Sequence, residues 1–322
     1  MSSKYPRFRL VVVDNASTDG SEQIVTRKYG ADRRLAVVAN ESNLGFAEGC
    51  NLGASRANGD YVIFLNNDTE VDRGAIGALV AALKENPSIG AAQSRLLMMT
   101  DKKRLDSTGD ILSTIGWPYS RGRYEIDQGQ YDSQRDVFSA RGAAMIVRKG
   151  VFDEVGGFDS DYFMYYEDLD LSWRIRLRGY TIVFVPESVV YHVGGRLSAY
   201  GNPRAVVNNM YSGRNYIATL VKNLELRNLL VYGSVHIVVH LSTIVFYLSQ
   251  RRVHEALGLV LALPRAIVDF PMMWGKRRVV QRFRVVSDKE IFRNVRKISI
   301  MDYLRSHIAR RILTRPRMMV RA

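Results

Sequence analysis

The sequence predicts an α/β protein in which helices flank a mostly parallel sheet. Short apolar runs alternate with helix-like patterns through the first 195 residues, and this alternation is typical of strand–helix–strand units. Polar residues directly follow the apolar run Tyr61–Leu65, and open α/β sheets bind their ligands at the carboxyl ends of strands. Farther along, long apolar stretches and a basic tail replace this alternation. We therefore expect one domain over residues 1–215 and a helical module over 216–322.

The expected strands are short runs rich in β-branched, leucine and aromatic residues. In chain order they cover residues 9–13, 35–38, 61–65, 89–97, 137–147 and 180–185. The first expected helix opens from the turn Asp14–Ser21, with Ser17, Thr18 or Asp19 available as its cap. Further helices are expected over residues 46–56, 74–85 and 169–178. Residues 100–136 have weak periodicity and many polar and glycine positions, so we expect a loop or hairpin over the site.

Composition and charge narrow the function classes. A chain of 322 residues with 47% hydrophobic residues is long enough for one large folded domain with an appendage. Its single cysteine, Cys50, excludes an intramolecular disulfide and suits a reducing compartment. Residues 251–322 hold 18 Lys and Arg against 5 Asp and Glu, so nearly all of the net charge of +14 lies there. Such a tail can bind nucleic acid or anionic lipid, or it can be a solvated basic face.

The apolar stretches beside the tail favour a membrane surface. Residues 229–248 contain no Lys, Arg, Asp or Glu, and about 20 such residues suffice to span a bilayer. A second stretch, 256–274, contains Pro264, Arg265 and Asp269, which argue against a span. We expect residues 229–274 to lie in the membrane interface, with the basic tail on anionic headgroups. A true span and an apolar packing or dimerising helix are the alternatives.

Carboxylates are crowded in the segment Phe163–Arg174. Glu167, Asp168 and Asp170 lie within four positions there. Because such groups repel one another, one of them can have a raised pKa and act as a base near neutral pH. Acidic residues in the first turn of a helix are the simpler interpretation, since the helix dipole favours them. A second acidic site, Asn66-Asn67-Asp68, ends a predicted strand and favours the catalytic interpretation.

Together, several motifs resemble glycosyltransferase family 2, whose members have the GT-A fold. Within this family, the chain is most similar to the rhamnosyltransferase-like branch that acts on lipid-linked cell-envelope saccharides. The resemblance covers roughly residues 5–215. The motifs are Val11-Val-Val-Asp-Asn-Ala-Ser-Thr-Asp-Gly-Ser21, Asn43-Leu-Gly-Phe-Ala-Glu-Gly-Cys-Asn-Leu-Gly53, Leu65-Asn-Asn-Asp-Thr69, Gly156-Gly-Phe-Asp159, Tyr165-Tyr-Glu-Asp-Leu-Asp-Leu171 and Tyr191-His-Val-Gly-Gly195.

This resemblance implies a metal and a base. Asp68 matches the acidic residue that binds a divalent metal, and hard oxygen ligands suit Mg²⁺ or Mn²⁺. His192 matches a position that meets the metal or the diphosphate. Asp168 matches the general base that takes the proton from the acceptor hydroxyl, and Glu167 would orient the acceptor or hold Asp168. Asp170 and Arg174 are spaced as a structural helix pair.

Nucleotide-sugar contacts are implied at further positions. Asp14 resembles the residue that accepts a hydrogen bond from the nucleotide base, and Asn15 begins the turn beside it. A loop lining the nucleotide pocket is matched by Asn43, Gly45 and Asn51, where glycine lets the backbone approach a ligand. Asn66 and Asn67 would contact the donor sugar or support the metal site, and Arg214 could contact the diphosphate. The loop around Trp117 would shape the acceptor site. The alternative for the nucleotide-loop residues is an ordinary role in turns and helix caps. The alternative for Arg214 is a surface arginine without a ligand.

One departure from the family concerns the segment before Tyr5. Members begin with a strand and a helix ahead of the segment that corresponds to Tyr5–Val13. We therefore expect a GT-A sheet that lacks its first strand, which would be central in the sheet and would lend residues to the nucleotide site.

The expected function is an inverting, metal-dependent glycosyltransferase at the cytoplasmic face of the cell membrane. The expected donor is dTDP-rhamnose, with a UDP-sugar as the alternative, and the expected acceptor is a polyprenyl-diphosphate saccharide. A catalytically inactive, membrane-bound relative is the second interpretation. A nucleic-acid-binding protein is the third, and the near-neutral charge of residues 1–250 argues against it. The oligomeric state is left open.

Overall fold

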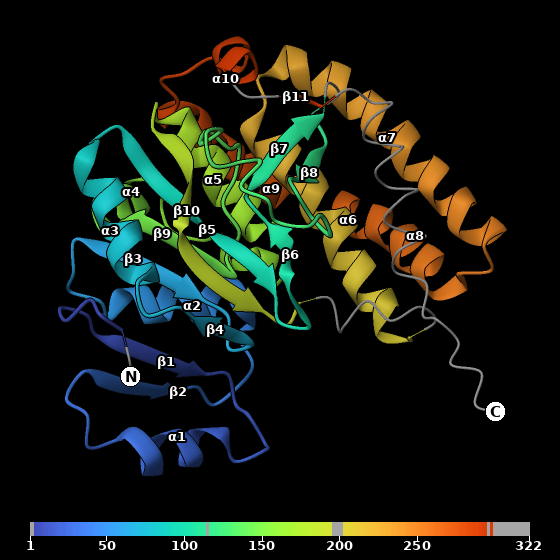
Figure 1. The fold of residues 1–322 in the computed structure, drawn as a ribbon. Coiled ribbons are helices and arrows are strands. Elements are labelled where there is room, and N and C mark those ends of the chain that lie inside the picture. Colours follow the sequence, from blue (N-terminus) through green and yellow to red (C-terminus); the bar gives the residue numbers. More distant parts are fainter. Residues whose placement is uncertain (1–2, 114–115, 195–201, 295–296, 299–322) are drawn as a thin grey trace, which may run out of the picture.

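The computed structural model describes residues 3–113, 116–194, 202–294 and 297–298. A twisted sheet with helices against it forms the middle of the molecule, and a group of long helices lies on the side away from the N-terminus (Figure 1). The strands are β1 (Leu10–Asp14), β2 (Leu35–Ala39), β3 (Tyr61–Leu65), β4 (Thr69–Val71), β5 (Ile89–Met98), β6 (Asp101–Ser107), β7 (Asp110–Ser113), β8 (Pro118–Ser120), β9 (Ala144–Arg148), β10 (Thr181–His192) and β11 (Lys297–Ile298). The α-helices are α1 (Ser21–Tyr29), α2 (Gly45–Ser55), α3 (Ala75–Glu85), α4 (Lys149–Glu154), α5 (Glu167–Leu177), α6 (Arg204–Asn223), α7 (Leu226–Ser249), α8 (Val253–Val268), α9 (Phe270–Phe283) and α10 (Asp288–Asn294).

The main sheet has six strands in the order β3-β9-β5-β10-β4, with β6 paired to β5. Only β5 and β10 run parallel in it; β3–β9, β5–β9, β10–β4 and β5–β6 are antiparallel. The expectation of a mostly parallel sheet is therefore wrong for this sheet. Alternating strands and helices do not reveal that β9, reached only after residues 99–143, inserts between β3 and β5 and runs back against both.

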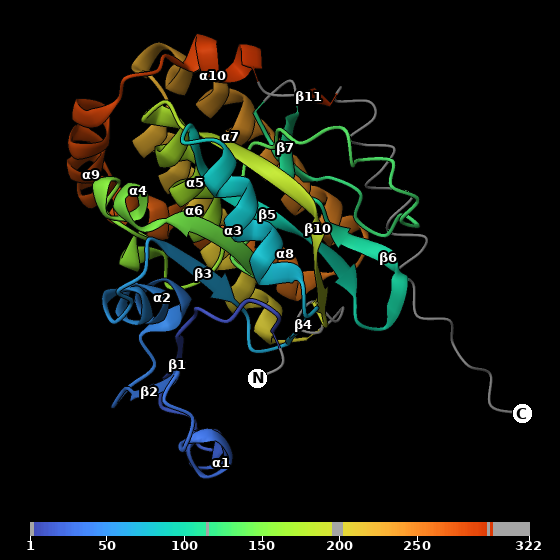
Figure 2. The same ribbon diagram turned by 60° about the vertical axis from the view of Figure 1, so that its left-hand side comes forward.

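A separate ribbon is formed by β1 and β2. These strands pair in parallel, and in the described residues neither belongs to the main sheet. None of their residues is fully buried, and α1 has no buried residue. Figure 2 shows the ribbon and α1 projecting from the rest of the molecule. In the described residues, the β1–β2 ribbon is therefore not paired with β3 or with any other strand of the main sheet.

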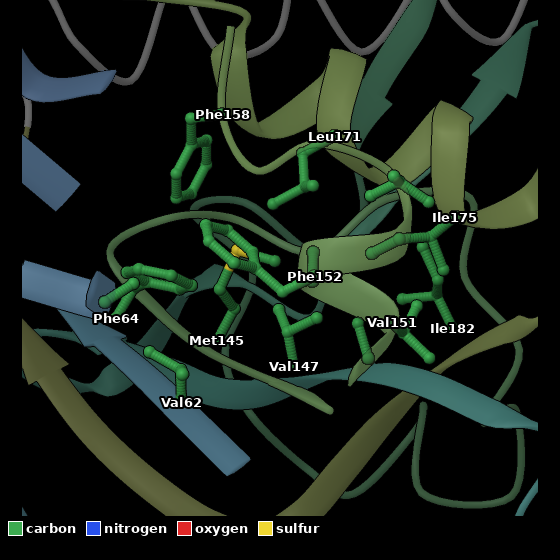
Figure 3. Packing of buried hydrophobic residues seen from close by; sticks show 14 of the residues in the cluster. Val62, Phe64, Met145, Val147, Val151, Phe152, Phe158, Leu171, Ile175 and Ile182 are labelled. Carbon is green, nitrogen blue, oxygen red and sulfur yellow. The ribbon is translucent and has the colours of Figure 1, made fainter. Parts of the chain in front are cut away.

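Aromatic and aliphatic side chains from β3, β9, α4 and α5 fill the core beneath the sheet (Figure 3). Within this core, Phe64, Phe152 and Phe158 pack on one another, with ring centroids 4.8 to 5.7 Å apart in edge-on or tilted arrangements. Burying each of these side chains contributes about 1.5–3 kcal/mol. The core therefore fixes α5 against the sheet, and α5 begins with the acidic segment.

Helix α6 connects the sheet domain to the helices that follow. It runs unbroken from Arg204 to Asn223, so the expected boundary between residues 215 and 216 falls inside it. Lys222, only 2% exposed, reaches Asp159 at 2.5 Å and Asp170 at 2.9 Å. Because buried charges are costly unless paired, this network fixes the register between α6 and α5.

Three local expectations differ from the structure. Residues 100–136 contain β6, β7 and β8 rather than one loop or hairpin. In the expected strand 137–147, the strand starts only at Ala144. The first helix has Gly20 at its N-cap and no side-chain cap, because Asp19 accepts its hydrogen bonds from Ser21 instead.

Candidate active site

The acidic segment follows a strained turn. Phe163, Tyr165 and Tyr166 have φ angles of +59°, +69° and +66°, a left-handed conformation that is costly for non-glycine residues. The buried side chain of Asn215, on α6, holds this turn. Its Nδ2 donates to the carbonyl oxygens of Tyr162, Met164 and Tyr165 at 2.8, 2.8 and 2.9 Å. Thus α6 helps to aim the first residues of α5.

Two carboxylates begin α5 in different surroundings. Glu167 is 6% exposed and its Oε2 has no hydrogen-bond partner among the described residues. Burial, and then the charge of Asp168, raise the pKa of Glu167 well above its usual value. Asp168 accepts hydrogen bonds from the N–H of Gly142 at 3.1 Å and of Leu169 at 2.8 Å. Its pKa is also raised, because burial and the charge of Asp110 outweigh these N–H groups. Such a shift suits a base that works near neutral pH.

The third carboxylate of this segment is structural, as expected. Asp170 pairs with Arg174 at 2.9 Å inside the protein. Although burial alone would raise its pKa, the charges of Lys222 and Arg174 lower it. Asp170 therefore stays ionised and ties α5 to α6.

Asp68 and His192 come together because β4 pairs with the end of β10. Thr69 lies opposite His192 in this ladder, and the Nε2 of His192 lies 3.2 Å from Asp68 Oδ1. The other ring nitrogen, Nδ1, lies 2.8 Å from Oδ2 of Asp106, at the end of β6. Burial would raise the pKa of Asp106, but the hydrogen bond with His192 and the charges of Arg123 and Arg141 lower it to about 2. Asp106 is therefore an anion at neutral pH.

Arg141 connects the two acidic regions. Its Nε lies 3.1 Å from Asp110 Oδ1. Burial opposes its charge, but Asp110, Asp106 and Asp168 together raise the pKa of Arg141. Arg141 thus contacts Asp110, and the charges of Asp106 on one side and of Asp168 on the other both act on it.

Sequence reasoning missed Asp106, Asp110, Arg141 and Asn215. The first two flank Gly109 in a stretch that was expected to be a loop, and acidic residues around a glycine there were the available signal. Arg141 precedes Gly142 between two apolar runs, which carries little information by itself. Asn215 lies in the middle of a helix, where nothing in the local pattern indicates a clamp.

The nucleotide-loop residues Asn15, Asn43 and Gly45 lie together. Asn15 donates to the carbonyl oxygen of Gly45 at 2.9 Å, and Asn43 accepts from the N–H of Gly45 at 2.9 Å. Gly45 has φ +82°, and a Cβ there would lie 2.5 Å from the ring of Phe163. Phe46 N–H also donates to Phe163 O at 2.6 Å. This loop is therefore built against the turn that leads to Asp168.

Of the other residues predicted to contact the nucleotide sugar, Asp14 and Asn51 form hydrogen bonds with the backbone of the protein itself. Asp14 accepts from the N–H of Ser17 at 3.0 Å. Asn51 exchanges two hydrogen bonds with the backbone of Phe158, at 2.8 and 2.9 Å. Asn66 has a buried Oδ1 without a partner among the described residues, whereas Asn67 is exposed.

Arg214 and Trp117 contact the helices that follow the sheet domain. Arg214 is 4% exposed, with its Nε 2.8 Å from Asp269 Oδ2 and its Nη1 3.0 Å from Asp161 O. It joins α6 to the start of α9, and its diphosphate contact stays a prediction. Trp117 packs on Tyr216 of α6 and His236 of α7, with ring centroids 4.6 and 5.2 Å apart. Gly195, in the last predicted motif, lies outside the described residues.

Comparison with known proteins shows which family the N-terminal part of this chain matches. The model named Glycosyl transferase family 2 matches residues 1–156. An N-acetylglucosaminyl-diphospho-decaprenol L-rhamnosyltransferase of Mycobacterium tuberculosis is 31% identical to this chain over 204 residues. Residues 1–156 therefore match glycosyltransferase family 2. That alignment covers 57% of this chain and 66% of the relative, slightly less than two thirds of its length. Another relative, a poly-beta-1,6-N-acetyl-D-glucosamine synthase of Staphylococcus aureus, is 27% identical over 58% of this chain and 43% of its own length.

Solved structures agree on the fold. GalNAc-T7, solved with UDP, GalNAc and Mn²⁺, has a TM-score of 0.51 at 18% identity and covers 66% of this chain and 42% of its own. The mannosyltransferase PcManGT of Pyrobaculum calidifontis, solved with GDP-Man and Mn²⁺, has a TM-score of 0.50 at 16% identity and covers 88% of this chain and 79% of its own. The fold is therefore the α/β GT-A-like fold of glycosyltransferases, followed by a helical region.

The residues at the end of β3 fit a divalent metal of this family only in part. No group of three or more His, Cys, Asp or Glu side chains is arranged to hold a metal within the described ranges. The pair of Asp68 Oδ1 and His192 Nε2 is nevertheless suitable. Their separation of 3.2 Å is close to the ~3 Å between neighbouring ligands of an octahedral ion with bonds of ~2.1 Å. Two protein ligands leave the other positions to water and to the phosphates of a substrate, as Mg²⁺ commonly binds.

Proposed function

We propose that this chain is an inverting, metal-dependent glycosyltransferase that moves a sugar from a nucleoside diphosphate to a lipid-linked or cell-envelope saccharide. One observation carries the proposal. Asp168, whose pKa is raised, lies at the start of α5, Asp68 and His192 lie 3.2 Å apart, and the charges of both Asp168 and Asp106 act on Arg141. This arrangement supplies a base for the acceptor at one end and two metal ligands for the donor diphosphate at the other.

The chemistry follows from these positions. Asp168 takes the proton from the acceptor hydroxyl as that oxygen attacks the anomeric carbon. A bound Mg²⁺ or Mn²⁺ would be held by Asp68 and His192 and would neutralise charge that grows on the leaving diphosphate. Attack from the side opposite the diphosphate inverts the anomeric centre in one step. The two N–H groups on Asp168 keep its carboxylate oriented while its raised pKa keeps it basic.

We propose rhamnose as the donor sugar, carried by dTDP, and a polyprenyl-diphosphate saccharide as the acceptor. The name of the Mycobacterium tuberculosis relative, at 31% identity, supports both choices. A UDP-sugar is the alternative donor, since GalNAc-T7 was solved with UDP.

We also propose that the helical region holds the enzyme on the cytoplasmic face of the membrane. The support is the inverted polarity of α7. Its three buried residues are His236, His240 and Ile244, and the two histidines contact the hydroxyl of Tyr216 and the carbonyl oxygen of Leu259, each at 3.0 Å. The outward residues of this helix are mostly apolar. They include Leu230, Val231, Ile237, Val238, Leu241, Val245 and Leu248, each at least 48% exposed.

Such a helix suits lipid better than water. Helices on the surface of soluble proteins turn their apolar side inward, and an exposed apolar surface of this extent marks a membrane or protein contact. By length and composition, α7 is the one described helix that could cross a bilayer, and the bent pair α8–α9 could be a second, broken span. Because α7 packs on α6 and α8, we propose that it lies in the interface.

Asp168→Asn tests the catalytic proposal. The variant removes the base and keeps its size, so turnover should fall at least ~10²-fold while nucleotide affinity stays unchanged. The assay incubates dTDP-rhamnose with a polyprenyl-diphospho-N-acetylglucosamine acceptor and measures dTDP release, with the product anomer read by NMR. Asp153→Asn, a change on the surface of α4, is the control. Equal turnover in the Asp168 variant would move the base to Glu167, and a retained anomeric configuration would contradict inversion. A chain that binds nucleotide but turns over no donor would be the inactive relative.

A further inference from the structure

Asp106 is buried beside the expected metal ligands without being one of them. It is 3% exposed. Its Oδ2 lies 2.8 Å from His192 Nδ1, on the side of the ring that faces away from Asp68. Arg123 Nε approaches its other oxygen at 3.5 Å. The proposed reaction gives this carboxylate no chemical role, so its burial next to an imidazole needs another explanation.

Gly194 and the β4–β10 ladder position the ring of His192. Gly194, with φ +46°, lies over it, and a Cβ at that position would be 3.1 Å from His192 Nδ1 and 3.5 Å from Asp106 Oδ2. The β4–β10 ladder places the backbone of His192 opposite Thr69, next to Asp68. Asp106 therefore contacts the nitrogen that points into the protein, and Asp68 contacts the nitrogen that points out.

A neutral imidazole carries one N–H and one lone pair, and the hydrogen bond made by one nitrogen decides the state of the other. An ionised carboxylate can only accept a hydrogen bond. With Asp106 accepting a hydrogen bond from Nδ1, Nε2 is the nitrogen left to give its lone pair to a metal beside Asp68 Oδ1, which lies 3.2 Å away. Without the carboxylate, either nitrogen could carry the proton, and the ring could also turn.

We propose that Asp106 is a positioning residue for the metal: it holds His192 in the Nδ1–H form and thereby makes Nε2 the ligand beside Asp68. Carboxylate–histidine–metal arrangements of this kind raise metal affinity, and removing the outer carboxylate costs 10–100-fold. The inference rests on the proposed metal role of Asp68 and His192, so its test must distinguish failure of that role from failure of the positioning.

The experiment measures Mn²⁺ binding directly, by the electron paramagnetic resonance signal of free Mn²⁺ during titration in the presence of dTDP. Four variants of the full chain are compared with the wild type: His192→Ala, Asp106→Ala, Asp106→Asn and Asp101→Asn. The control, Asp101, is on the same strand β6 and pairs with Arg104. In parallel, ¹⁵N-labelled histidine reports the tautomer of His192 without metal, with its signals assigned by their loss in His192→Ala.

The expected result is that Asp106→Ala weakens Mn²⁺ binding 10–100-fold and removes the Nδ1–H signature of His192, while Asp101→Asn changes neither. Asp106→Asn keeps the shape of the side chain and can still accept a hydrogen bond through its amide oxygen. If His192→Ala weakens binding and a folded Asp106→Ala does not, the positioning role is refuted and the metal role stands. If the alanine variant does not fold, loss of the Nδ1–H signature in Asp106→Asn without weaker Mn²⁺ binding refutes the positioning role. If His192→Ala itself binds Mn²⁺ normally, the metal role fails, and this inference fails with it.

Discussion

Replacing three outward side chains of α7 with glutamine should release the protein from membranes. Leu230, Val238 and Val245 lie within one side of the helix and are 67%, 63% and 65% exposed. Glutamine is a good helix former, and none of the three residues is in the core, so the fold should be kept. The triple variant therefore tests the outward face of α7 by itself.

The size of the effect follows from these exposures. Transferring a whole leucine or valine side chain out of water contributes about 1.5–3 kcal/mol. Scaled by the exposed fraction, each of the three contributes about 1–2 kcal/mol, or about 3–6 kcal/mol in all. A loss of this size lowers the partition coefficient by about two to four orders of magnitude.

Co-sedimentation with vesicles of phosphatidylcholine and phosphatidylglycerol measures this coefficient at low and high salt. The matched control is Ser234→Gln with Ser242→Gln, which puts the same side chain on exposed polar positions of the same helix. The control should partition like the wild type. If the triple variant, folded by circular dichroism, also partitions like the wild type, α7 does not face lipid. If the wild type itself stays in the supernatant at low salt, an oligomer contact becomes the better account of α7.

Three further changes test the site. Asp68→Ala should weaken Mn²⁺-dependent binding of dTDP at least ~10-fold, because Asp68 would hold the ion that neutralises the diphosphate charge. If calorimetry shows no effect of either a chelator or the mutation, Asp68 is not a metal ligand. Glu167→Gln should become more stable relative to the wild type as the pH rises. The folded-state pKa of Glu167 is raised, so the wild type is fully stabilised below the usual glutamate pKa and loses stability as the pH rises through the raised value. Thermal melting from about pH 5 to about pH 9 should show the variant gaining relative to wild type as pH rises, and a constant difference would contradict a neutral, buried Glu167. Asn215→Ala removes three hydrogen bonds to the turn before α5 and should cost about 2–4 kcal/mol of unfolding free energy, together with a fall in kcat larger than any change in KM. An unchanged melting temperature would show that the turn holds itself.

Local sequence patterns predicted most of the helices and strands, and they predicted the positions of Asp68 and Asp168 in the candidate site. The run Tyr61–Leu65 is β3 as expected, and Asp68 and Asp168 lie where strand-end and helix-start chemistry placed them. What local patterns could not predict depends on pairing over long sequence separations. Asp106 meets His192 across 86 residues, and Asn215 meets the turn before α5 across about 50. Neither contact follows from propensity or periodicity.

The sheet order and the polarity of α7 were missed for a related reason. An apolar run shows that a strand is buried and leaves its direction open, so the insertion of β9 could not be read from the sequence. A run such as 229–248 shows apolar character and leaves open which side faces the protein. Only the contacts of His236 and His240 show that the polar side is turned inward.

The buried pairing of Lys222 with Asp159 and Asp170 has a consequence for acceptor length. Since α5 and α6 are locked together by charges that cannot separate without large cost, the helices that follow α6 cannot tilt independently of Asp168. If those helices lie on the bilayer, the base stands at a constant height above the lipid. Acceptors would then be selected by the number of sugar units between the lipid and the reactive hydroxyl, because the ion pairs between α5 and α6 would fix the distance from the membrane to Asp168.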